Sequence, residues 1–168
     1  TQYETVISEE ALDRWIAEAR HKGYVAIDTE TDALDNMTAR LVGISLATEP
    51  NKACYIPIGH GGGDLYSDAP KQLPAGLVLD RLRPLLEDPA VLKVAHNLKY
   101  DWAMFQKAGI DVAPYDDTLV MSFDLDAGRL NHGLDELAQA HFEHECISFK
   151  SVCGVGAKQI SFDKVPLD

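Results

Sequence analysis

The sequence has few basic residues, few cysteines and no long apolar run. Fifteen Lys and Arg residues stand against 27 Asp and Glu residues, which gives a formal net charge of -12, and such a surface repels phosphate backbones at long range. This charge argues against a free-standing protein that binds nucleic acid. No apolar run approaches the roughly 20 residues of a membrane-spanning helix, and the first residues lack a secretory pattern. We therefore expect a cytoplasmic protein that contacts no membrane.

The cysteines are too few for a disulfide framework. Cys54, Cys146 and Cys153 are an odd number, which is typical of a reducing compartment. The 168 residues are 46% hydrophobic and 25% charged, which suits one domain with a core of its own. Because the chain begins at Thr1 without Met and stops at Asp168, we expect it to be a fragment of something longer.

The first sixty residues predict one helix and three strands. Ser8 is a suitable N-cap and Gly23 a suitable end for a helix whose apolar residues follow the helical period, namely Leu12, Trp15, Ile16 and Ala19. Three apolar runs separated by turn residues follow it, over 24–27, 40–47 and 53–59. Strands that succeed each other so closely pair as an antiparallel meander.

The remainder of the chain predicts alternating strands and helices. We expect strands over 91–97 and 110–114, and helices near 75–87, 98–108, 117–125 and 133–142. Such alternation adds parallel strands to a sheet. The predicted fold class is therefore α/β, with a mixed sheet of three antiparallel strands and then two parallel strands, flanked by helices.

The most informative segment is an apolar strand that runs directly into carboxylates. Asp28 and Glu30 are two residues apart, so in a strand their side chains point to the same face. Two like charges held together need a cation or a proton between them, and hard oxygen ligands suit Mg²⁺ or Mn²⁺. For an isolated Asp-x-Glu, the simpler interpretation is a strand that ends in solvent.

A second predicted strand, over 91–97, also ends in polar residues. Asn97 is expected to cap the following helix, and Asp101 lies in its first turn, where it can face the ends of the strands. The simpler interpretation is a well-capped helix. Together, however, the two segments place three carboxylates at one edge of one sheet, which favours a metal site.

The sequence around these motifs resembles that of a known family. The runs DTETDALD (28–35) and NLKYD (97–101), with YIP (55–57) and RPLLED (83–88), resemble the 3′-5′ proofreading exonuclease domain of bacterial DNA polymerase I. The resemblance extends from the first helix to about residue 165 and implies a ribonuclease-H-like fold of the four-carboxylate (DEDD) exonucleases. It implies that residues 1–168 are a single exonuclease domain from a longer polymerase chain, active in DNA replication and repair.

The resemblance also assigns roles to individual residues. Asp28, Glu30 and Asp101 would be catalytic and would hold two divalent ions, Mg²⁺ or Mn²⁺, with Zn²⁺ as an alternative at one site. Leu34 would wedge against the terminal base, and Phe149 would stack on a neighbouring base. The implied substrate-binding residues are Thr31, Leu34, His96, Asn97, Tyr100 and Phe149.

One expected motif is absent. The family has Tyr-x-x-x-Asp shortly beyond the point where this sequence stops, and no Tyr follows Tyr115. That motif would supply a Tyr that orients water and the fourth carboxylate. We therefore expect this 168-residue chain alone to be nearly inactive.

The sequence is consistent with three hypotheses of function. The first is a metal-dependent 3′-5′ exonuclease domain, monomeric and nucleoid-associated in a bacterial cytoplasm, whose partners are a frayed or single-stranded 3′ end of DNA and a polymerase domain in the same chain. The second is a vestigial module that guides DNA without catalysis, and the third is an RNA exonuclease like ribonuclease D. A zinc site is disfavoured, because the spacing of its candidate ligands matches no usual zinc motif: His141, His144, Cys146 and Cys153.

Overall fold

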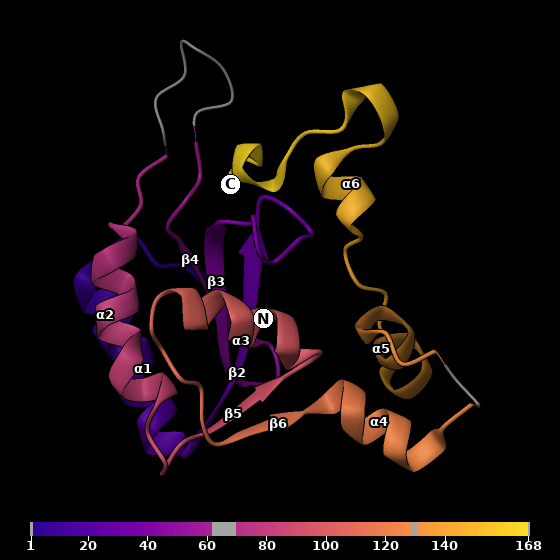
Figure 1. Cartoon of the computed structure of the whole chain (residues 1–168), viewed down its shortest axis with the longest axis horizontal. Coiled ribbons are helices and arrows are strands. Elements are labelled where there is room, and N and C mark those ends of the chain that lie inside the picture. Colours follow the sequence, from indigo (N-terminus) through magenta and orange to yellow (C-terminus); the bar gives the residue numbers. More distant parts are fainter. Residues whose placement is uncertain (1, 62–69, 129–130, 168) are drawn as a thin grey trace.

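A computed structural model describes residues 2–61, 70–128 and 131–167. Six strands form one sheet in the order β1-β4-β3-β2-β5-β6 (Figure 1). The strands are β1 (Gln2–Thr5), β2 (Tyr24–Thr31), β3 (Leu41–Glu49), β4 (Lys52–Pro57), β5 (Leu92–Ala95) and β6 (Tyr115–Asp117). The helices are α1 (Glu9–Lys22), α2 (Ala75–Leu86), α3 (Leu98–Lys107), α4 (Thr118–Asp126), α5 (Leu134–Phe142) and α6 (Phe149–Cys153), followed by short 3₁₀ turns η1 (Gly156–Lys158) and η2 (Phe162–Lys164).

The mixed sheet is confirmed. β2, β3 and β4 pair antiparallel, and β5 and β6 add to β2 in parallel. The prediction omitted β1, which pairs parallel with β4, because its sequence QYET has no apolar run and is largely exposed.

The last strand was predicted in the wrong place. Residues 110–114 do not form a strand, and the pairing with β5 begins at Tyr115. Ile110 and Val112 are instead buried in the core, so their apolar character reflects packing. A proline also cannot donate to a strand ladder, which disfavours a strand that includes Pro114.

One face of the sheet carries the core. The prediction for α1 is confirmed: Ser8 accepts a hydrogen bond from the Ala11 amide, and Gly23 ends the helix with a φ of 75°, a left-handed conformation that glycine adopts without steric cost. The odd-numbered residues of β2 from Val25 to Thr29 are buried, and their even-numbered neighbours Tyr24, Ala26 and Asp28 are exposed. This alternation assigns one face of β2 to the core that α1, α2 and α3 share, and leaves the other for Asp28 and Glu30.

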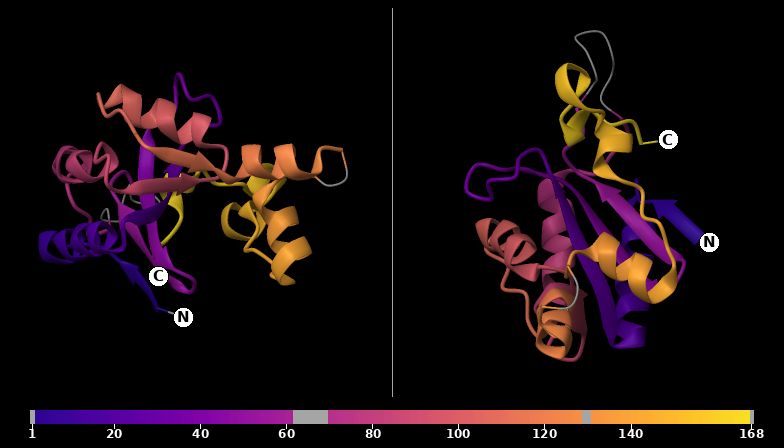
Figure 2. Two further views of the ribbon diagram at one scale, coloured as in Figure 1. Left: turned by 90° about the horizontal axis from the view of Figure 1, so that it is seen from below. Right: turned by 90° about the vertical axis from the view of Figure 1, so that its right-hand side faces the viewer.

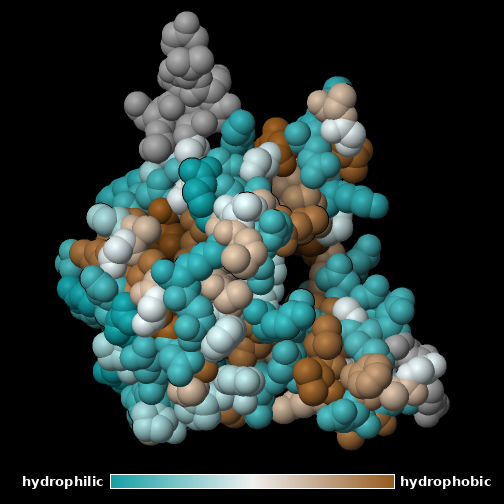
Figure 3. All heavy atoms as spheres, viewed as in Figure 1, coloured by the Kyte–Doolittle hydropathy of each residue, from teal (hydrophilic) through white to brown (hydrophobic). Residues whose placement is uncertain are grey.

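The part of the chain that follows β6 leaves the body of the fold. Figures 1 and 2 show α4, α5 and α6 extending beyond the sheet before the C-terminal residues return to it. α4 and α5 contain no buried residue, and several of their large apolar side chains are exposed, among them Phe123, Leu125 and Phe142. Figure 3 shows such brown apolar surface alongside a hollow between this arm and the body. Among the residues described, no helix has the length and apolar character needed to cross a membrane.

Candidate active site

The carboxylates of the first motif lie within a strand and not beyond its end. β2 runs to Thr31, four residues further than predicted, because β3 continues to pair with it opposite Asp28 and Glu30. Asp28 is exposed and Glu30 is half-buried. Pairing of the backbone therefore fixes the positions of both residues.

Asp101 reaches the same strand from α3. Its Oδ1 atom accepts hydrogen bonds from the Thr29 amide at 2.9 Å and from the Thr29 hydroxyl at 2.5 Å. Its side chain is buried, with a relative exposure of 3%. Since Thr29 lies between Asp28 and Glu30 in the sequence, these bonds hold Asp101 against the same part of β2.

The helix that carries Asp101 is capped differently from the prediction. Asn97 has a left-handed backbone (φ 62°) and its side chain makes no capping hydrogen bond. Asp117, at the end of β6, accepts hydrogen bonds from the amides of Asn97 and Leu98, each at 2.9 Å. A carboxylate satisfies free amides at a helix N-terminus and is favoured by the helix dipole, so β6 fixes the start of α3.

The three carboxylates interact electrostatically. Burial is the largest cause that raises the pKa of Glu30 to about 7, and the charges of Asp28 and Asp101 contribute to the same rise. Burial also raises the pKa of Asp101 to about 6, with Asp28 adding to the rise and the bonds from Thr29 opposing it. Like charges that are partly buried disfavour each other's ionisation. A bound cation would therefore stabilise the ionised carboxylates.

The donors suit a divalent cation in kind, although they are not gathered around one point. Within the described ranges, no group of three or more His, Cys, Asp or Glu side chains is placed to hold a metal ion. Asp101 Oδ1 accepts its two hydrogen bonds from Thr29. The other carboxylate oxygens are hard donors of the kind that Mg²⁺ and Mn²⁺ prefer, and a cation would relieve the repulsion that raises the pKa of Glu30 and Asp101.

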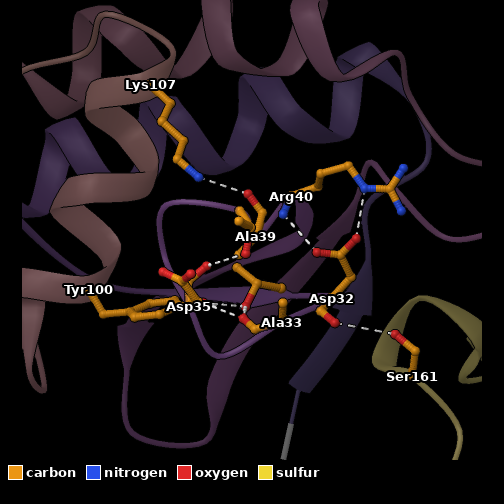
Figure 4. Close-up of polar contacts among 10 residues, drawn as sticks. Asp32, Ala33, Asp35, Ala39, Arg40, Tyr100, Lys107 and Ser161 are labelled. Carbon is orange, nitrogen blue, oxygen red and sulfur yellow. Dashed lines mark hydrogen bonds and ion pairs between the residues drawn. The ribbon is translucent and has the colours of Figure 1, made fainter.

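The loop between β2 and β3 is held in a defined conformation. Figure 4 shows Asp32 accepting bonds from Arg40, through the backbone amide and through Nε, each at 2.7 Å. The Tyr100 hydroxyl donates to the Ala33 carbonyl at 2.6 Å and lies 2.7 Å from the Thr31 hydroxyl. These contacts fix the base of the loop, while Leu34 projects from it with a relative exposure of 97%.

A groove of about 680 Å³ lies beside Glu30. Thr31, Leu34 and Phe149, three of the predicted substrate-binding residues, line it together with Glu30. Its opposite wall was not predicted and is formed by Gln159, Ile160, Ser161 and Phe162. No local pattern marks these four residues, because they approach β2 only through the return of the chain from α6.

The other predicted substrate-binding residues do not line this groove. His96 bonds through Nδ1 to the Thr118 hydroxyl at 2.9 Å and lines a separate hollow of about 320 Å³, together with Asp28. Tyr100 reaches the groove only through its bonds with Thr31 and Ala33. Asn97 is exposed at the start of α3.

Comparison with known sequences and structures gives consistent matches. A family model described as 3′-5′ exonuclease matches residues 3–165. DNA polymerase I of Rhizobium leguminosarum is 45% identical over 179 residues, and that of Pseudomonas aeruginosa is 35% identical over 170 residues; each match covers 99% of this chain. The chain spans 18% of the length of either relative.

Solved nucleases share the fold. Escherichia coli RNase D, described as an exoribonuclease involved in structured RNA processing, superimposes with a TM-score of 0.66 at 19% identity, over 90% of this chain and 36% of that one. Brucella melitensis NrnC with bound Mg²⁺ superimposes with a TM-score of 0.61 at 22% identity, over 93% of this chain and 68% of that one. These likenesses establish the ribonuclease-H-like fold.

Proposed function

The chain belongs to the 3′-5′ exonuclease family found in DNA polymerase I, and from this premise we propose that it removes nucleotides from the 3′ end of single-stranded or frayed DNA. The observation that carries the proposal is the bond of Asp101 to Thr29, the residue between Asp28 and Glu30 in β2. The groove beside Glu30 offers a path for a single strand.

The proposed chemistry is hydrolysis of a phosphodiester bond. Two divalent ions, Mg²⁺ or Mn²⁺ with Zn²⁺ as an alternative at one site, would lower the pKa of the attacking water and stabilise the leaving 3′-oxygen. Asp28, Glu30 and Asp101 would hold these ions. Thr29 fixes the orientation of Asp101, and Leu34 and Phe149 present apolar surface on which bases can rest.

We further propose that residues 1–168 form one domain of a longer polymerase chain, and that the third exonuclease motif follows residue 168. An uncovered surface supports this. The hollow beside Asp28 is lined by small apolar residues and by Leu134 of α5, and His96 Nε2 is buried without a hydrogen-bond partner in the part of the chain that is described. Buried polar atoms are normally paired. A following helix could cover the hollow and bring the fourth carboxylate.

DNA is favoured over RNA as the substrate. The sequence relatives that match nearly the whole chain are DNA polymerases, whereas the exoribonuclease shares only the fold. A vestigial domain is disfavoured because a protein without metal would gain stability by losing crowded carboxylates. In the cell, the attached polymerase would deliver the strand, so an acidic surface would not prevent binding.

The test compares two proteins, the 168-residue chain and a form extended through the third motif. Each is incubated with 5′-labelled single strands of DNA or RNA and with Mg²⁺ or Mn²⁺. We expect the extended form to shorten DNA stepwise from its 3′ end and the 168-residue chain to be nearly inactive. Equal rates for the two proteins would refute the need for a fourth carboxylate, and a preference for RNA would favour the ribonuclease reading.

A further inference from the structure

The proposed chemistry leaves one buried histidine unexplained. His60 follows β4 and has a relative exposure of 3%. Gln72 holds its backbone on both sides, because the His60 amide donates to Gln72 Oε1 at 3.0 Å and Gln72 Nε2 donates to the His60 carbonyl at 2.7 Å. The position of the imidazole is therefore fixed by main-chain contacts that do not involve its ring.

Both ring nitrogens of His60 have partners. Nδ1 lies 3.1 Å from the Val165 carbonyl oxygen, and Nε2 lies 2.7 Å from the Tyr55 hydroxyl. A carbonyl oxygen only accepts, so we assign the proton of the neutral ring to Nδ1, and Nε2 then accepts from Tyr55. Burial lowers the pKa of His60, which agrees with a neutral ring.

Tyr55 connects this ring to the strand that carries Glu30. Gly43 of β3 pairs with Glu30, and the Tyr55 hydroxyl lies only 2.0 Å from where a Cβ atom of Gly43 would be. Glycine at position 43 thus leaves the space that the tyrosine ring occupies. A row of contacts leads from Glu30 through Gly43 and Tyr55 to His60.

The segment that His60 holds forms one wall of the groove. Val165 lies three residues after Phe162, the last of the four residues that face Thr31 and Leu34 across the groove. The Gly61 amide supports the same segment by donating to the Asp163 carbonyl at 2.9 Å. The rings of His60 and Phe162 also lie near each other, with centroids 6.0 Å apart.

We propose that His60 is a positioning residue, which with Tyr55 holds residues 159–165 against the sheet and so sets where a terminal nucleotide lies relative to Glu30. This inference rests on the proposed function, because it concerns the groove of that same site. His60 acts through the wall of the groove and touches no reacting atom.

The first measurement tests the contact itself. Lys158 and Lys164 flank the wall and are exposed, so trypsin cleavage after them reports how often the segment detaches. We expect His60→Ala to accelerate cleavage at both lysines about tenfold. His60→Asn should restore most of the protection, because its amide nitrogen can donate in place of Nδ1. His21→Ala, an exposed change on α1, is the matched control and should cleave at the original rate.

The second measurement tests the consequence for the substrate. In the extended form, His60→Ala should raise KM for a short DNA strand about tenfold and change kcat by less than about threefold, because the carboxylates stay in place. His60→Asn should restore KM. The proposal is overturned if His60→Ala leaves tryptic cleavage or KM unchanged, or if His60→Asn behaves like His60→Ala in both assays. Should no form cut any strand, the nuclease function fails, whereas the trypsin rates still decide whether His60 holds the wall.

Discussion

Asp101 and Thr29 form the contact on which the geometry of the site depends. A single carboxylate oxygen, Asp101 Oδ1, accepts from both the amide and the hydroxyl of Thr29. The amide belongs to the backbone of β2, so Asp101 is held at a fixed point against this strand.

Thr29→Val tests this contact. The change keeps the shape and the amide bond but removes the hydroxyl donor, so we expect a loss of about 1 kcal/mol in the free energy of unfolding and weaker binding of Mn²⁺. Urea unfolding and metal titration measure the two effects. Thr48→Val is the matched control, because it removes a hydroxyl bond to Glu18 of 2.6 Å far from the site. If both variants bind Mn²⁺ equally well, Thr29 does not orient a metal ligand.

Glu30→Gln should stabilise the fold at neutral pH. The pKa of Glu30 is raised from 4.5 to about 7 in the folded state, so its ionisation opposes folding. The cost is absent below pH 4.5, where the carboxyl is protonated in both states, and grows as the pH rises toward 7. We expect Glu30→Gln to raise the free energy of unfolding by about 1–3 kcal/mol at pH 8 and by little at pH 4. A gain of the same size at both values would show that the charge is not its cause.

Lys93→Met should destabilise the fold although Lys93 is remote from the groove. Lys93 is fully buried, and its Nζ atom donates to the carbonyls of Val91 at 2.7 Å, Ala113 at 2.6 Å and Asp88 at 2.9 Å. Losing the ammonium leaves buried acceptors unpaired, which costs about 1–3 kcal/mol. Denaturant unfolding should show this loss, whereas the exposed change Lys99→Met should have almost no effect. Equal stability of the two variants would contradict the assigned role of Lys93.

Leu34→Ala should affect substrate and not stability. Its side chain is 97% exposed on a loop fixed by Asp32, Arg40 and Tyr100, so no core contact is lost. In the extended form we expect KM for a single strand to rise several-fold and the melting temperature to stay constant. Leu125→Ala, 87% exposed on α4, is the control and should leave both unchanged. A fall in melting temperature with KM unchanged would mean that Leu34 serves the fold.

Elements defined by local patterns were predictable from the sequence. Ser8, Gly23 and the apolar positions between them determine α1, and the apolar runs around turns determine the β2–β3–β4 meander. The same patterns made Asp28, Glu30 and Asp101 candidate site residues. Asp28 and Glu30 follow an apolar run, and Asp101 lies in the first turn of the helix after another one.

Features that depend on distant parts of the chain were missed. Asp117 caps α3 in place of Asn97, and nothing near residue 97 in the sequence shows that β6 ends beside it. The same holds for the wall at Gln159–Phe162. It also holds for β1, which is a strand because it pairs with β4 and whose own residues do not show a strand pattern. Contacts between distant segments are set by tertiary packing, which a local pattern does not contain.

The proposed active site depends most on the carboxylates at the end of β2, and Asp28→Ala in the extended form tests their role directly. Asp28 is exposed, so its loss opens no cavity, and Asp124→Ala on α4 serves as a control that removes an equal charge elsewhere. The measurement is the rate at which a 5′-labelled DNA strand with a mismatched 3′ end is shortened in Mg²⁺. We predict a loss of at least about a hundredfold for Asp28→Ala, with the fold intact and with Asp124→Ala as active as the original protein. Undiminished shortening by Asp28→Ala would contradict the assignment of the active site.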